Sequence, residues 1–233
     1  GIKFLKKNNI KIFKVPSGEI TNFKYLEMVS KNAKKILLST GASTINEIKN
    51  AMRILKKYIK KKDIVVMHCN SAYPTPLRDI NLNSIPFISK KLKCNVGFSD
   101  HSSIIETSIF AVAMGADVIE KHFTLNTNFS GPDHKASINP KDFKKMIDSI
   151  RIFEKSRGRF LKKITSSEKR NRKIIRKSIV AKHFIKKGEI FNDYNIVSKR
   201  PGFGISPMNW KKIIGKRAQK NFYPDQFITI KNL

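Results

Sequence analysis

The chain has 233 residues, 40% of them hydrophobic, which is enough for a sizeable core and suits one larger domain followed by a small one. Its 48 Lys and Arg against 17 Asp and Glu give a formal net charge of +31, but the basic residues are spread along the whole chain among many Ile and Asn, so we do not expect nucleic acid as the partner. No apolar run reaches about 18 residues, which excludes a membrane-spanning helix, and two cysteines, Cys69 and Cys94, are too few for a disulfide framework, so we expect a cytoplasmic protein.

Short apolar runs alternate with segments of helical period along the first two thirds of the chain. The runs that predict strands are 10–15, 36–38, 64–67, 95–98 and 117–119. Thr44 and Glu47 form a capping box that predicts a helix start. Further helices are expected from Ser103 to a stop at Gly115, and after Asn139, which precedes a proline. Strand followed by helix, repeated in this way, predicts a parallel sheet.

Polar residues follow each predicted strand at its carboxyl end. They are the stretches SGE (17–19), STG (39–41), HCNS (68–71), SDH (99–101) and EKH (120–122). Polar groups gathered there are typical of the active-site face of a (β/α)8 TIM barrel. A doubly wound open sheet is the main alternative, but it usually carries a glycine-rich phosphate loop, and this sequence shows none. Five strands are visible where a barrel has eight, so the visible strands fall three short of a (β/α)8 TIM barrel.

Two histidines follow consecutive predicted strands. His101 and His122 would lie on strands about 4.8 Å apart, so both imidazoles could reach one ion. A lone histidine beside a strand is more often a structural residue, but each of these lies near a carboxylate, Asp100 or Glu120, that could fix its tautomer. Positions left open for water and substrate suit a Lewis-acid ion such as Mn²⁺, with Mg²⁺ or Co²⁺ as alternatives, better than a closed zinc site.

Seven ordered motifs carry a resemblance to a known family. They are KVPSGE (14–19), LLSTGAST (37–44), HCNSAYPTPLRDINL (68–82), GFSDHS (97–102), IEKHFT (119–124), GPDHKAS (131–137) and KRPGFGISPM (199–208). In this order they resemble the sialic acid synthase family over nearly the whole chain, and the last two favour its N-acetylneuraminate and legionaminate branch. Members of this family condense phosphoenolpyruvate with an N-acetylated hexosamine to a nine-carbon acidic sugar. The resemblance therefore implies a transferase with this activity.

The resemblance also implies a domain organisation. A partial TIM barrel that lacks about its first three βα units would span 1–155, a linker 156–173, and a small, mostly β, antifreeze-like domain (SAF, β-clip) 174–233. In the last we expect strands at 178–181, 196–199 and 227–230 and a brief helix after Ser206. In the family this domain reaches over the partner subunit of a domain-swapped homodimer, which implies that Arg200 completes the neighbouring sugar site. Without the resemblance, Arg200 would be a turn residue on a solvated face.

The resemblance assigns a role to each candidate site residue. His101 and His122 would hold the divalent metal that polarises the sugar aldehyde. The residues expected to bind phosphoenolpyruvate are Lys14, Ser17, Ser99 and Ser71, the last where some members have asparagine. Those expected to face the acceptor sugar are Tyr73, Glu19 and Asp133, with the two carboxylates as catalytic groups. From the residues alone, Ser17 and Glu19 could equally be turn residues and Tyr73 a packing residue.

Two other functions stay open. A catalytically incomplete synthase could act as a binding module for RNA or an acidic polymer, which salt-dependent binding without metal dependence would support. Another barrel aldolase or lyase would need a Schiff-base lysine, for which Lys14 is the evident candidate. The chain begins at Gly1 with neither an initiator methionine nor a signal-peptide pattern, so we expect a piece of a longer protein. Because an open five-strand sheet would expose two long edges and an unsatisfied core, we also expect these residues to be inactive and prone to associate by themselves.

Overall fold

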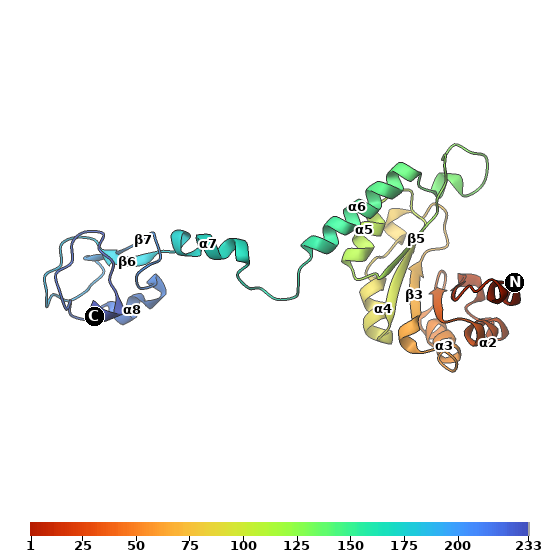
Figure 1. Cartoon of the computed structure of the whole chain (residues 1–233), viewed down its shortest axis with the longest axis horizontal. Helices are drawn as coiled ribbons and strands as arrows, with labels where there is room; N and C mark the ends of the chain where they lie inside the picture. The colour runs from red at the N-terminus through yellow and green to blue at the C-terminus, as the bar shows by residue number, and fades with distance from the viewer. Residues whose placement is uncertain (233) are drawn as a thin grey trace. The chain divides into compact units, whose positions relative to one another are not determined.

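The computed structural model describes residues 1–232, which divide into two compact units (Figure 1). Unit 1 is Gly1–Gly158 and unit 2 begins at Arg159. The helices of unit 1 are α1 (Ile2–Lys7), α2 (Phe23–Asn32), α3 (Ile45–Leu55), α4 (Ser84–Leu92), α5 (Glu106–Ala113) and α6 (Pro140–Ser156). Short 3₁₀ turns lie at Ser17–Glu19, Lys61–Asp63, Leu77–Asp79 and His134–Ala136. Within the described range, none of the helices is long and apolar enough to cross a membrane.

A parallel sheet of five strands forms the centre of unit 1 within residues 1–158. The strands are β1 (Ile12–Val15), β2 (Lys35–Ser39), β3 (Ile64–Cys69), β4 (Asn95–Asp100) and β5 (Val118–Lys121). Their spatial order follows the chain, and a helix connects each strand to the next, so the predicted strand–helix alternation is confirmed. Each crossover helix adds the next strand at the same edge of the sheet, and the sheet curls into a half-barrel.

The core of unit 1 lies between the sheet and its helices. In β3 every residue from Ile64 to Met67 is buried, and across the first three strands Val15, Leu38 and Val66 are 0% exposed. They pack against helix residues such as Leu26 and Leu55, which are 0% exposed. Burying each such side chain stabilises the fold by about 1.5–3 kcal/mol. Since a slip of one residue would turn these side chains to the other face, this core sets the register of the sheet and the direction in which each strand end points.

Helix starts in unit 1 show where local sequence signals hold. Thr44 Oγ1 accepts from the Glu47 amide at 3.3 Å and Glu47 Oε2 accepts from the Thr44 amide at 2.7 Å, so the predicted capping box is confirmed. The predicted start at Ser103 is wrong: α5 begins at Glu106, after a loop whose carbonyl at Ile104 accepts from Lys121 Nζ at 2.9 Å. This long-range contact holds the loop out of the helix.

Unit 2 has its own apolar core. The elements of unit 2 are α7 (Ser166–Ile175), the antiparallel strands β6 (Ser178–Ala181) and β7 (Ile196–Lys199), and α8 (Trp210–Ile213). Short 3₁₀ turns lie at Pro207–Asn209 and Ile230–Asn232. Ile185, Phe191 and Phe222 are 0% exposed in this core. The predicted strands at 178–181 and 196–199 and the brief helix after Ser206 are confirmed. The predicted strand at 227–230 is wrong, because Phe227 forms an isolated bridge with Val180 and the chain then turns.

The stretch predicted as a linker, 156–173, holds most of helix α7. The helix begins with a capping box, in which Thr165 Oγ1 accepts from the Glu168 amide and Glu168 accepts from the Thr165 amide. Every residue of α7 is exposed, so its helical form rests on local signals. Its carboxyl end is fixed in unit 2, where the Gly202 amide donates to the Lys173 carbonyl at 2.7 Å.

Candidate active site

Three aromatic rings meet at the carboxyl edge of the sheet. The rings of Tyr73 and His101 stack with centroids 4.1 Å apart and planes at 25°. The His122 ring lies edge-on to both, 5.4 Å from each centroid. These residues follow β3, β4 and β5 respectively, and parallel strands end at the same edge. The structure therefore brings together the two histidines and the tyrosine that the sequence singled out.

His101 is oriented by a backbone carbonyl. Its Nδ1 lies 2.5 Å from the carbonyl oxygen of Asn70, and its Nε2 lies 3.2 Å from Ser99 Oγ. Because a carbonyl can only accept, Nδ1 carries the proton and Nε2 keeps a lone pair. Burial of the ring lowers its pKa, which favours this neutral form. The prediction that Asp100 fixes the His101 tautomer is wrong.

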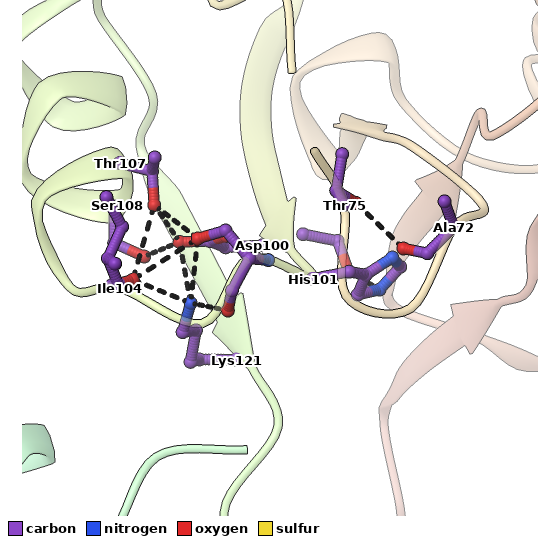
Figure 2. Close-up of polar contacts among 10 residues, drawn as sticks. Ala72, Thr75, Asp100, His101, Ile104, Thr107, Ser108 and Lys121 are labelled. Carbon is purple, nitrogen blue, oxygen red and sulfur yellow. Dashed lines mark hydrogen bonds and ion pairs between the residues drawn. The ribbon is translucent and has the colours of Figure 1, made fainter. Parts of the chain in front are cut away.

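Asp100 instead points away from His101, as Figure 2 shows. Its carboxylate lies 3.0 Å from Lys121 Nζ, and both side chains are almost fully buried, at 0% and 1% exposure. Its other partners are the Ser102 amide at 2.8 Å and the hydroxyls of Thr107 and Ser108, both at 2.6 Å. Burial alone would raise the pKa of Asp100, but Lys121 and these donors outweigh it and lower the pKa. The carboxylate is therefore charged at neutral pH.

His122 faces a different carboxylate from the one predicted. Its Nδ1 lies 4.0 Å from Asp133 Oδ2, a side chain that is 58% exposed. Glu120, predicted as its partner, forms an ion pair with Lys14 Nζ at 3.0 Å. Side chains alternate along a strand, so Glu120 and His122 lie on the same face, and Lys14 reaches Glu120 from β1. The predicted residues Lys14, His122 and Asp133 thus lie around the same strand ends.

Two predicted serines converge on Gly41, which the sequence does not single out as a site residue. The Gly41 amide donates to Ser17 Oγ at 2.8 Å, and Ser17 Oγ lies 3.4 Å from Cys69 Sγ. A Cβ atom on Gly41 would lie 2.5 Å from Ser71 Oγ and 2.9 Å from Ser17 Oγ, so another residue would displace both hydroxyls. The signal that could have identified Gly41 is its position directly after a buried strand, where a missing side chain allows close approach.

Two predicted site residues, Glu19 and Arg200, form hydrogen bonds within their own parts of the chain. Glu19 accepts from Asn22 Nδ2 at 2.6 Å at the start of α2, and among the described residues no contact joins it to the histidines. Arg200 belongs to unit 2, where its Nε donates to the Ile175 carbonyl at 3.1 Å. Ser99 is buried beside His101 rather than open to a ligand, with 2% exposure.

The two imidazoles suit a metal ion that takes its remaining ligands from water or substrate. Within residues 1–232 no group of three His, Cys, Asp or Glu could hold an ion without such help. The Nδ1–H of His101 donates to a carbonyl, which is the arrangement usual for a metal-bound histidine and leaves Nε2 as the ligand. The donor set of His101 and His122 therefore fits an open divalent site.

A curled parallel half-barrel sheet with histidines, serines and a lysine at its carboxyl edge is typical of an α/β enzyme. The chain belongs to the NeuB family, whose pattern matches residues 1–162, and residues 176–233 match the SAF domain. The predicted family resemblance is thereby confirmed.

Relatives with named activities support this membership. The N,N'-diacetyllegionaminic acid synthase of Campylobacter jejuni is 46% identical over 228 residues, which is 97% of this chain and 68% of the relative. The human N-acetylneuraminate-9-phosphate synthase is 32% identical over 93% of this chain and 60% of its own length. A crystal structure of N-acetylneuraminic acid synthetase from Leptospira borgpetersenii superposes with a TM-score of 0.68 at 34% identity, covering 73% of this chain and 59% of that one. The chain thus spans roughly two thirds of the length of such relatives.

Proposed function

We propose that this protein condenses phosphoenolpyruvate with an N-acetylated hexosamine, releasing phosphate and forming a nine-carbon sialic-acid-type sugar. The observation that carries the proposal is the meeting of Tyr73, His101 and His122 at the strand ends, with ring centroids 4.1–5.4 Å apart. Membership of a family whose relatives are named as sugar-acid synthases supports it. The acceptor would be N-acetylmannosamine or a 2,4-diacetamido-trideoxyhexose.

Different residues of unit 1 would bind the two substrates. Lys14, with the hydroxyls of Ser17 and Ser71 around Gly41, would bind the phosphate and carboxylate of phosphoenolpyruvate, because an ammonium and hydroxyl donors suit an anion. Lys14 already lies 3.0 Å from Glu120, so the substrate would compete with that carboxylate for the ammonium. Ser99 would act through His101, whose Nε2 it faces at 3.2 Å.

On the acceptor side, Tyr73 and Asp133 would meet the sugar. Asp133 is 58% exposed beside His122, so it can accept from a sugar hydroxyl or relay a proton. Glu19 belongs to this set by its family motif and would need to leave Asn22 to take part. His101 and His122 would hold a divalent cation, Mn²⁺ rather than Mg²⁺ or Co²⁺, which when bound supplies Lewis-acid polarisation of the sugar aldehyde.

We further propose that the half-barrel is part of an eight-stranded barrel and that the protein acts as a domain-swapped homodimer in which Arg200 completes the partner's sugar site. The division into residues 1–155, 156–173 and 174–233 belongs to the same proposal. Support comes from relatives that are longer than this chain and from the SAF match at 176–233.

The test is a condensation assay with phosphoenolpyruvate labelled with ¹⁸O at the bridging C–O oxygen. We expect Mn²⁺-dependent formation of a nine-carbon acid from one of the two acceptor sugars, with the label in the released phosphate because the C–O bond is cleaved. Borohydride trapping of a lysine adduct would contradict the proposal and favour an aldolase. The assay is run on this chain alone and on a chimera that adds the segment of the Campylobacter relative to which it does not align. No turnover in either protein would overturn the proposal.

A further inference from the structure

The ion pair between Asp100 and Lys121 has no free hydrogen-bonding capacity for a substrate. The three protons of the Lys121 ammonium are matched by Asp100 at 3.0 Å and by the carbonyls of Ser102 and Ile104 at 2.7 and 2.9 Å. The Asp100 carboxylate accepts from the Ser102 amide and from two hydroxyls as well as from Lys121. Buried charges persist only when paired in this complete way. The pair is therefore not a binding group, and its role must lie in what it holds.

What the pair holds is the backbone on which both histidines stand. Asp100 and Lys121 are register partners on β4 and β5, and each directly precedes a histidine, His101 or His122. Neighbouring side chains on a strand point to opposite faces, so the pair lies on one face and the two imidazoles on the other. Figure 2 shows Asp100 and His101 pointing in opposite directions. An ion pair here ties the two strand ends together directly beneath the rings.

The same network reaches the loop that carries Tyr73. The carbonyl of His101 accepts from the Thr75 amide at 2.9 Å. Thr75 Oγ1 in turn donates to the Ala72 carbonyl at 2.8 Å, as Figure 2 shows. The loop is thus fastened to the backbone immediately after Asp100. A shift of that backbone would move His101 and Tyr73 together.

We infer that Asp100 and Lys121 are positioning residues, which fix the separation and orientation of His101 and His122 and so set the affinity of this pair for a divalent metal. The inference rests on the proposed function for the metal, whereas the geometry it describes involves only the side chains and backbone of this chain. Substituting a residue that orients a metal-binding histidine without touching the metal typically lowers metal affinity by 10- to 100-fold.

The experiment compares Asp100→Asn, Lys121→Met and the double variant with the unaltered protein. Asp100→Asn keeps the shape of the side chain, and the double variant removes both charges, so that neither is left buried and unpaired. The control is Leu26→Ala, a fully buried core change on α2 that lowers stability without touching the strand ends. Mn²⁺ affinity is measured by electron paramagnetic resonance on the folded fraction, and the imidazole tautomers by ¹H–¹⁵N NMR without metal.

We expect all three variants to lose at least tenfold in Mn²⁺ affinity, while Leu26→Ala keeps the affinity of the unaltered protein. In the metal-free spectra, His101 should be a single Nδ1–H tautomer in the unaltered protein and a mixture in the variants. Unchanged tautomers and unchanged affinity would overturn the inference. If the unaltered protein binds no Mn²⁺, the metal role in the proposed function fails, and the tautomer comparison alone decides the positioning role. If one single variant does not fold, the double variant decides.

Discussion

Tyr73 occupies a position from which it can serve both the histidines and a ligand. One face of its ring stacks on His101, while half of the side chain is exposed. Burial raises the pKa of its hydroxyl, and the negative charges that Cys69, Asp133 and Glu120 can carry raise it further. The hydroxyl therefore stays protonated at neutral pH and can donate a hydrogen bond to a sugar oxygen.

Two substitutions separate these roles of Tyr73. Tyr73→Phe keeps the stack, so we expect unchanged Mn²⁺ affinity and a loss of roughly tenfold in kcat/KM, the equivalent of one neutral hydrogen bond. Tyr73→Ala also removes the stack, so metal affinity should fall too. The measurements are steady-state kinetics and Mn²⁺ titration. If Tyr73→Phe matched the unaltered protein in kcat/KM, the hydroxyl would have no contact with the acceptor.

Protonation of buried histidines should limit stability in acid. Burial lowers the pKa of both His101 and His68 below the unfolded value of about 6.5. Below that pH the unfolded chain binds protons that the folded chain does not, so the stabilisation present above pH 6.5 is lost as the pH falls through the folded pKa values. We expect the urea midpoint of unit 1 to be constant from pH 8 to 7 and to fall below about pH 6.5.

A histidine substitution checks the origin of this pH dependence. His68→Gln can keep a donor near the Ile80 carbonyl, which lies 2.8 Å from Nε2, but cannot titrate. The fall in the urea midpoint between pH 6.5 and 5 should therefore be smaller in this variant. An unchanged pH profile in both His68→Gln and His101→Gln would assign the acid loss to other groups.

At the scale of elements, local signals predicted the structure wherever the partner is near in sequence. The start of α3 depends on Thr44 and Glu47, three residues apart, and the sequence predicts it. The start of α5 depends on Lys121, which reaches back to the Ile104 carbonyl across 17 residues, and the sequence pattern at Ser103 does not contain that information. Hydrophobic periodicity predicts a strand but not where its pairing stops. It therefore predicts a strand at 227–230, where the structure has only the isolated bridge of Phe227.

In the candidate site, too, some contacts can be predicted from the sequence and others cannot. Motifs predicted His101, His122, Tyr73 and Asp133 as neighbours, and the structure groups them. The direction of Asp100 could not be predicted, because it depends on which face of β4 meets Lys121 and α5. Sequence adjacency to His101 suggested a contact that alternation along the strand prevents.

The two capping boxes should differ in their effect on stability. Thr44→Ala removes the cap of α3, whose Ile48, Met52 and Leu55 are buried in the core of unit 1, so we expect a loss of about 1 kcal/mol in urea unfolding. Thr165→Ala removes the same box from α7, which is exposed throughout, so circular dichroism should show less helix with the urea midpoint unchanged. Thr44→Ser, which keeps the hydroxyl, is the control. Equal shifts in midpoint from both alanine variants would show that α7 is packed in solution.

At the scale of the whole chain, the positive charge is concentrated in unit 2. Residues 1–158 carry 28 Lys and Arg against 13 Asp and Glu, whereas residues 159–233 carry 20 against 4. A groove of about 860 Å³ in unit 2 is lined by five basic residues, Lys169, Arg172, Lys173, Arg176 and Lys177, together with Ile175, Gly202, Gly204, Ser206, Pro207 and Met208. This local excess of positive charge gives the binding-module hypothesis a specific surface on which it can be tested.

Binding of single-stranded RNA to this groove should be electrostatic and indifferent to metal. If about five phosphates are neutralised, affinity should fall roughly 100-fold between 50 and 200 mM salt, following the slope of about 0.7 per phosphate for single strands. Arg172→Glu with Arg176→Glu should abolish most of this binding, measured by fluorescence anisotropy of a labelled oligonucleotide. The matched control, Lys211→Glu with Lys212→Glu, makes the same charge change on α8, outside the groove. Equal losses in both pairs would mean that net charge, not the groove, attracts RNA. Salt-dependent binding that is indifferent to metal, in a protein without synthase turnover, would favour the binding module over the enzyme.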